Sequence, residues 1–123
     1  MTILVEVCVD GIGSAQAAVT GGAGRMELCA DRASGGLTPS PGMVEAIRQI
    51  SDKPLAILIR PRAGDFLYDN AEFGVMRRDV TWSRELGAEA VVIGVARDDG
   101  TIDLERTAEL AALARPMDVV YHR

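Results

Sequence analysis

The stretch Leu55-Ala56-Ile57-Leu58-Ile59-Arg60-Pro61-Arg62 decides the fold. Its first five residues form a continuous apolar run, which is typical of a strand buried on both faces of a parallel sheet. The run ends in two arginines, Arg60 and Arg62. Because the chemistry of parallel sheets gathers at the carboxyl ends of the strands, this stretch predicts a strand and also the edge where a functional site is expected.

The same pattern recurs along the chain. Further strand-like runs lie at residues 3–9, 25–28, 91–93 and from about 118 onwards. Helix-like segments separate the strands, at 15–20, 43–50, 72–86 and 104–114. Ser14, Ser40 with Pro41 behind it, and Asp103 are the residue types that begin helices. Strands that alternate with helices predict an α/β fold with a parallel sheet, because parallel pairing needs a crossover connection.

The length of the chain allows one domain, over residues 1–123. Hydrophobic residues make up 48% of the sequence, which is enough for a buried core. Four βα units and a fifth strand fit an open doubly wound sheet, or the N-terminal half of a (β/α)₈ barrel of the TIM type, which typically needs ~250 residues. The sequence stops on a strand that should carry a further loop, and this favours the interrupted barrel.

Charge and composition exclude several classes of function. A net charge of −5, with no cluster of lysines or arginines, argues against a nucleic-acid-binding surface. No apolar run approaches the ~20 residues of a membrane span, and no signal peptide is recognisable. We therefore expect a cytoplasmic protein without a membrane partner. Its two cysteines are expected to be reduced thiols.

Carboxylates interrupt two of the strand-like runs. Glu6 and Asp10 lie on one face of the first strand, and Glu27 interrupts the second. A buried carboxylate is costly unless it is paired or faces a polar cavity, so Arg60 and His122 are the expected partners. Such a rim could bind a polar ligand, with Glu27 and His122 as acid and base. The alternative is a structural ion-pair network.

The cysteines occupy equivalent positions, since Cys8 follows Glu6 by two residues and Cys29 follows Glu27 by two. If the first two strands are neighbours, their thiols can approach each other. Soft thiolates select Cu(I) or zinc, and a site with two ligands suits Cu(I), because zinc takes further ligands. The alternative is that both are small buried side chains that pack as hydrophobes.

Two guanidinium groups follow the third strand. Arginine forks suit a carboxylate or a phosphate, so Arg60 and Arg62 are candidate anion-binding residues. The alternative is that one arginine pairs with Glu27 or Asp65 while the aromatic loop packs over the rim of the sheet.

Several motifs together resemble the CutC family of copper homeostasis proteins. They are Glu6-Val7-Cys8-Val9-Asp10, Arg25-Met26-Glu27-Leu28-Cys29, Gly35-Gly36-Leu37-Thr38-Pro39-Ser40, Ile59-Arg60-Pro61-Arg62-Ala63-Gly64-Asp65-Phe66-Leu67-Tyr68, Gly94-Val95 and Tyr121-His122-Arg123. The resemblance implies a (β/α)₈ barrel, a cytoplasmic and often oligomeric protein, and Cu(I) binding that involves Cys8 and Cys29. A polar rim that also includes Arg123 looks more like an enzyme site than a copper clamp.

The resemblance leaves three hypotheses for function. The first is a Cu(I)-binding copper homeostasis protein, and the second is an enzyme that acts on a small anionic metabolite without an organic cofactor. The third is an inactive fragment, since the family's chains are longer than this one. In a half barrel the first and fifth strands would be exposed edges, and unpaired edges recruit other chains, so we expect a homo-oligomer.

Overall fold

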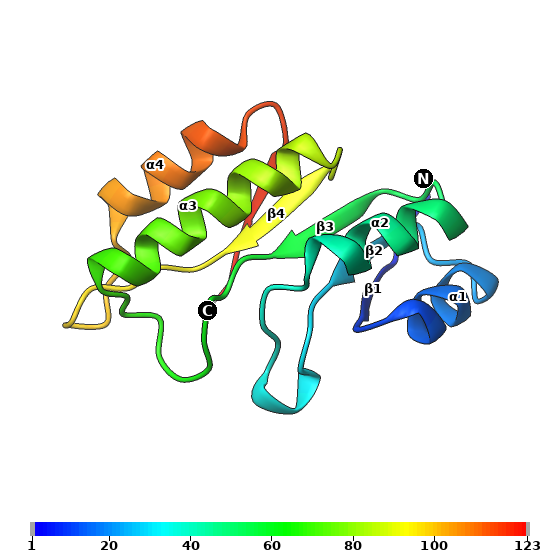
Figure 1. Ribbon diagram of the computed structural model, residues 1–123, viewed down its shortest axis with the longest axis horizontal. Coiled ribbons are helices and arrows are strands. Elements are labelled where there is room, and N and C mark those ends of the chain that lie inside the picture. Colours follow the sequence, from blue (N-terminus) through cyan, green and yellow to red (C-terminus); the bar gives the residue numbers. More distant parts are fainter. Residues whose placement is uncertain (1, 123) are drawn as a thin grey trace.

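A single parallel sheet organises the chain (Figure 1). The computed structural model describes residues 2–122, and its five strands pair in the order β1-β2-β3-β4-β5, each parallel to its neighbours. The strands are β1 (Glu6–Val9), β2 (Arg25–Leu28), β3 (Leu55–Leu58), β4 (Ala90–Ile93) and β5 (Asp118–Tyr121). The predicted α/β fold with a parallel sheet is therefore confirmed.

Helices connect the strands, and their starts follow local chemistry. They are α1 (Ile12–Thr20), α2 (Pro41–Ile50), α3 (Asn70–Glu85) and α4 (Leu104–Ala114), with a short 3₁₀ turn, η1 (Arg32–Ser34), before α2. The Ser40 hydroxyl accepts a hydrogen bond from the backbone N–H of Met43, and the Asp103 carboxylate accepts one from Arg106, as predicted for helix caps. None of these helices is long and apolar enough to cross a membrane.

Two predicted boundaries are wrong by three residues. Helix α1 begins at Ile12, so Ser14 lies inside it, and its hydroxyl accepts hydrogen bonds from the N–H groups of Asp10 and Gly11. Strand β1 begins at Glu6 instead of residue 3, and the side chains of residues 3–5 are exposed. The register explains the late start, because Glu6 lies opposite Arg25, where the partner strand begins.

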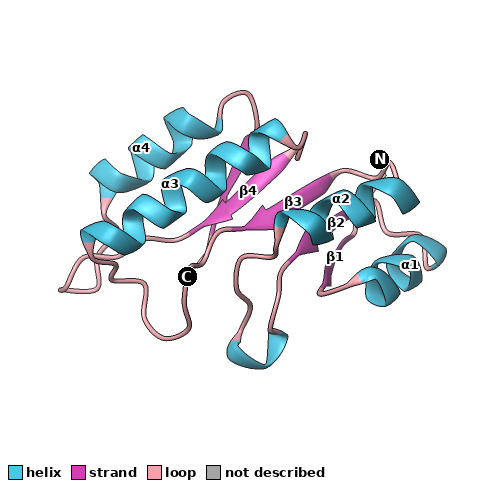
Figure 2. Ribbon diagram, in the orientation of Figure 1, coloured by secondary structure: helices cyan, strands magenta, loops and turns pink. Residues whose placement is uncertain are grey.

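All four helices pack against the same face of the sheet, which we call the outer face (Figure 2). One apolar cluster unites residues from every helix with alternate residues of the strands, such as Val9, Ile57 and Val91. Strands that advance in sequential order through right-handed crossovers place every helix on one side, whereas a doubly wound sheet reverses its strand order. The observed order is therefore that of barrel-type βα units.

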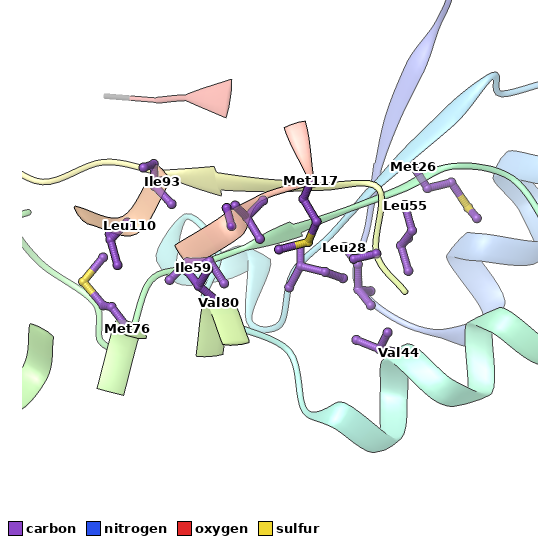
Figure 3. Packing of buried hydrophobic residues seen from close by; sticks show 14 of the residues in the cluster. Met26, Leu28, Val44, Leu55, Ile59, Met76, Val80, Ile93, Leu110 and Met117 are labelled. Atoms are coloured by element: carbon purple, nitrogen blue, oxygen red, sulfur yellow. The ribbon is translucent and has the colours of Figure 1, made fainter. Parts of the chain in front are cut away.

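The core lies between the outer face and the helices (Figure 3). Figure 3 shows Leu28 of β2 above Val44 of α2, and Ile59, just after β3, beside Val80 of α3; all four belong to this cluster. The opposite face, which we call the inner face, carries a smaller apolar cluster. Its members are Cys29, Ala56, Leu58, Ala90 and Val92, with Val120 packed against them.

Both edges of the sheet lie open within residues 2–122. Strand β1 pairs with β2 alone, and β5 pairs with β4 alone. Most side chains of these two strands are exposed or only partly buried. The association of these edges with other chains stays a prediction.

Truncation of a central core residue should destabilise the fold. Ile57 is fully buried at the centre of β3, and Ile57→Ala is expected to lower the free energy of unfolding by about 2–5 kcal/mol, because it leaves a cavity. Urea denaturation followed by circular dichroism measures this loss. Ile3→Ala provides the matched control, since that side chain is 81% exposed and its removal should have little effect. Equal losses for the two variants would contradict the described core.

Candidate functional site

A pocket of about 300 Å³ opens at the carboxyl ends of the strands, above the inner face. Glu27 from β2, Arg60 after β3 and His122 after β5 all line it. Its remaining walls are formed by Ser34, Gly35, Leu58 and Phe66. The structure therefore brings together three of the polar residues that the sequence singled out, from strands far apart in the chain.

Arg60 is the most heavily bonded residue of the pocket. Its side chain is buried, with 8% exposed. Nη1 donates to the carbonyl oxygens of Ser34 and Gly36, and Nη2 donates to that of Gly64, each at 2.9 Å. Nε is buried and has no partner among residues 2–122. The guanidinium carbon also lies 5.4 Å from the centre of the Phe66 ring.

Two consecutive glycines allow the chain to wrap around Arg60. Gly35 and Gly36 have φ values of +92° and +100°, which L-residues with side chains rarely adopt. A Cβ on Gly36 would also lie 2.9 Å from Cδ2 of Leu58. Glycine at these positions therefore lets two backbone carbonyls turn toward the guanidinium group of Arg60.

His122 is held against the rim by its backbone and by an aromatic contact. Its N–H donates to the Ile93 carbonyl at 2.8 Å, and its ring meets the Phe66 ring edge to face, with the ring centres 5.1 Å apart. Its Nε2 is buried without a partner in the described part of the chain. Burial lowers the pKa of His122, and the charge of Arg60 lowers it further, so the imidazole is neutral at pH 7.

Gly94 provides the space that His122 occupies. A Cβ at this position would lie 2.7 Å from the backbone oxygen of His122 and 2.8 Å from its Cε1. The first of these atoms belongs to the backbone and cannot swing aside. In the sequence, Gly94 is notable only as part of the Gly94-Val95 motif. Its proximity to His122 depends on the fold.

Glu27 faces the pocket without a partner. No hydrogen bond or ion pair to the Glu27 carboxylate occurs within residues 2–122. Burial raises the pKa of Glu27, the nearby Glu6 raises it further, and Arg25 opposes both. A carboxyl group with a raised pKa and a neutral imidazole thus line the same pocket, and groups of these two kinds can hold and transfer protons.

The predicted pairing of Glu6 and Glu27 with Arg60 and His122 is wrong. Glu6 forms an ion pair with Arg25 instead. The reason is the strand register, which places Glu6 directly opposite Arg25 on the neighbouring parallel strand. Arg25 lies on the neighbouring strand at the same level as Glu6, whereas Arg60 follows a strand two positions away in the sheet.

Arg62 stabilises its own loop and does not line the pocket. It forms ion pairs with Glu72 and Asp65, donates to the Leu67 carbonyl at 2.6 Å and lies 4.9 Å above the centre of the Tyr68 ring. The pairing with Asp65 is the alternative that the sequence left open. Arg62 therefore has few donors left for an anion.

Of the two other predicted rim residues, Asp10 does not line the pocket. Asp10 is exposed and accepts a hydrogen bond from the Ser14 hydroxyl at the start of α1. Arg123 lies outside the described residues.

The two cysteines lie side by side on the inner face. Their Sγ atoms are 3.8 Å apart, close enough for a hydrogen bond between the thiols. Cys8 is exposed, whereas Cys29 is buried. Burial raises the pKa of the Cys29 thiol to about 12, with contributions from the hydrogen bond to Cys8 and the negative charge of Glu27. Residues 2–122 hold no group of three or more potential metal ligands, so the thiol pair stands alone.

The fold and these positions can be compared with known proteins. The sequence model that describes the CutC family matches residues 3–123 of this chain. The chain belongs to the CutC family. It is 46% identical over 120 residues to the mouse copper homeostasis protein cutC homolog, and 48% identical over 121 residues to the CutC family protein of Sinorhizobium medicae. Each alignment covers 98% of this chain but only 44% and 49% of the relatives, so the chain spans about half of their length.

A crystal structure of the CutC protein of Streptococcus agalactiae has the same fold. It superposes with a TM-score of 0.91 at 31% identity, over 98% of this chain and 59% of that one. The agreement supports the sequential βα arrangement of this CutC chain.

Adding one methyl group at Gly94 should disturb the pocket. Gly94→Ala places a carbon against the backbone of His122, and such overpacking is expected to lower the free energy of unfolding by about 1–3 kcal/mol. Gly13→Ala is the control, because nothing lies within 4 Å of its Cβ and alanine favours helix α1. Urea denaturation should show opposite signs for the two variants. A neutral Gly94→Ala would contradict the close contact.

The imidazole of His122 should titrate below its ordinary pKa of 6.5. The folded chain then binds fewer protons than the unfolded chain near pH 6, so this group's contribution to stability is lost as the pH falls. The chain has one histidine, so its NMR resonances can be assigned without mutation. The same resonance in urea provides the control, with a midpoint near 6.5. Equal midpoints in both states would show that His122 is not buried beside Arg60.

Proposed function

We propose that this CutC chain binds Cu(I) through the thiolates of Cys8 and Cys29, as part of a cytoplasmic copper homeostasis protein. The observation that carries the proposal is the 3.8 Å separation of the two Sγ atoms. The names of the mouse and human relatives, which both describe copper homeostasis proteins, agree with it. Copper is here the cargo of the protein.

The donor set favours Cu(I) over other metals. Soft thiolates select Cu(I) and zinc over hard cations, and zinc almost always takes four ligands at structural sites. Within residues 2–122, no group of three or more His, Cys, Asp or Glu side chains could hold a metal ion. The donor set is therefore the two sulfurs, which suit a metal that accepts two donors. Cys8 is exposed and borders an open hollow at the edge of the sheet, so the pair is accessible from solvent.

Copper must displace protons from these thiols. The raised pKa of Cys29 keeps its thiol protonated at neutral pH, and the exposed Cys8 is the first thiol that an incoming ion meets. Each proton released makes the apparent affinity rise with pH by up to about tenfold per unit. A reducing cytoplasm would keep both sulfurs available, because disulfides are rare there.

Titration with Cu(I) against a chromophoric chelator tests the proposal. The wild-type chain should bind one equivalent, and the double variant Cys8→Ser/Cys29→Ser should lose this binding, because hydroxyls are poor ligands for Cu(I). The affinity of the wild type should also increase between pH 6 and pH 8. Ser14→Ala is a control for an oxygen donor near Cys8 and should bind as the wild type does.

Circular dichroism of the double variant verifies that it remains folded. Tight Cu(I) binding by the folded double variant would overturn the proposal. So would an affinity that does not change with pH, since thiol ligands must lose their protons.

A further inference from the structure

The pocket of Glu27, Arg60 and His122 has no role in the proposed copper site, because neither cysteine lines it. We propose that this pocket binds the carboxylate group of a small organic acid through the free donors of Arg60, beside His122 and Glu27. The inference does not depend on copper binding, since it is based on different residues.

The free donors of Arg60 match a carboxylate. A guanidinium group has five N–H donors, and three of those in Arg60 reach the carbonyls of Ser34, Gly36 and Gly64. One N–H of Nη2 and the N–H of Nε remain, and Nε is buried without a partner in residues 2–122. Two remaining donors on one planar group suit the two oxygens of a carboxylate.

The charge of Arg60 also favours an anion. Only 8% of Arg60 is exposed. Its side chain nevertheless forms no ion pair with a carboxylate of the described residues. Carbonyl oxygens solvate the guanidinium group, but they do not neutralise it. A buried charge without a counter-ion is costly, so an anion that contacts Arg60 in the pocket is stabilised.

The remaining walls limit the kind of acid. Among the described lining residues only Arg60 contributes a positive charge, because His122 is neutral at pH 7. The carboxylate of Glu27 contributes a negative charge, which disfavours a doubly charged ligand. One positive charge favours a singly charged carboxylate over a phosphate dianion. Leu58 and Phe66 provide apolar contacts for a short carbon chain, and about 300 Å³ is at the small end of ligand pockets.

Binding of a carboxylate should change the ionisation of His122. The charge of Arg60 lowers the pKa of His122, and an anion on Arg60 would cancel that effect. The buried Nε2 of His122 has no partner in the described chain, so no hydrogen bond there competes with its protonation. The single histidine of the chain is therefore a natural reporter of binding.

An NMR titration of the His122 Cε1–H resonance tests the inference on the complete chain. Acetate, added at constant ionic strength, should cause a saturable shift and raise the midpoint of the His122 titration. Acetamide has nearly the same shape without the charge and should cause no saturable shift. Inorganic phosphate should bind more weakly than acetate.

Variants identify the binding residue. Arg60→Lys should weaken acetate binding by about tenfold, because lysine cannot offer two parallel donors. Arg78→Lys, on the exposed side of α3, is the matched control and should bind as the wild type does. Cys8→Ser/Cys29→Ser should retain acetate binding, which separates this inference from the copper proposal.

Four results would overturn the inference. They are the absence of a saturable shift with acetate, an equal response to acetamide, tighter binding of phosphate than of acetate, and unchanged binding by a folded Arg60→Lys variant. The first three concern the wild-type chain, so they hold even if Arg60→Lys fails to fold.

Discussion

The sequential order of the parallel strands is the constraint on which the rest of this structure depends. Crossovers between neighbouring parallel strands, which are right-handed as a rule, place all four helices on the outer face. Since side chains alternate along a strand, every second residue then points to the inner face. Cys8, Glu27, Arg60 and His122 share this face or its carboxyl edge for that reason. The outer face supplies the stability of the CutC chain, and the inner face remains available for chemistry.

Arg60 connects the strand ends to the loops around them. Its side chain joins the loop that holds Gly36 to the loop that holds Gly64, and its backbone exchanges two hydrogen bonds with Thr38, at 2.7 and 3.0 Å. Phe66, in the second loop, is thereby held against the His122 ring. One buried guanidinium group thus organises the residues that close the pocket, while it keeps two donors unused.

The charge of Glu27 acts on both the thiol pair and the polar pocket. Glu27 lines the pocket, and its negative charge also raises the pKa of Cys29. In the sheet, Glu27 lies directly opposite Cys8. A change in the ionisation of Glu27 is therefore felt at the sulfurs as well as in the pocket. Glu27 thus links the thiol pair and the pocket, which lie beside the apolar cluster of the inner face.

The sequence by itself determined the features that depend on neighbouring residues. The apolar run at 55–59, the caps Ser40 and Asp103, and the parity that puts both cysteines on one face could be read directly. Only the tertiary structure decided that Glu6 pairs with Arg25, that Arg62 is occupied by its own loop, and that Gly94 makes room for His122. These contacts depend on strand register and loop path, which arise from interactions between residues distant in the chain.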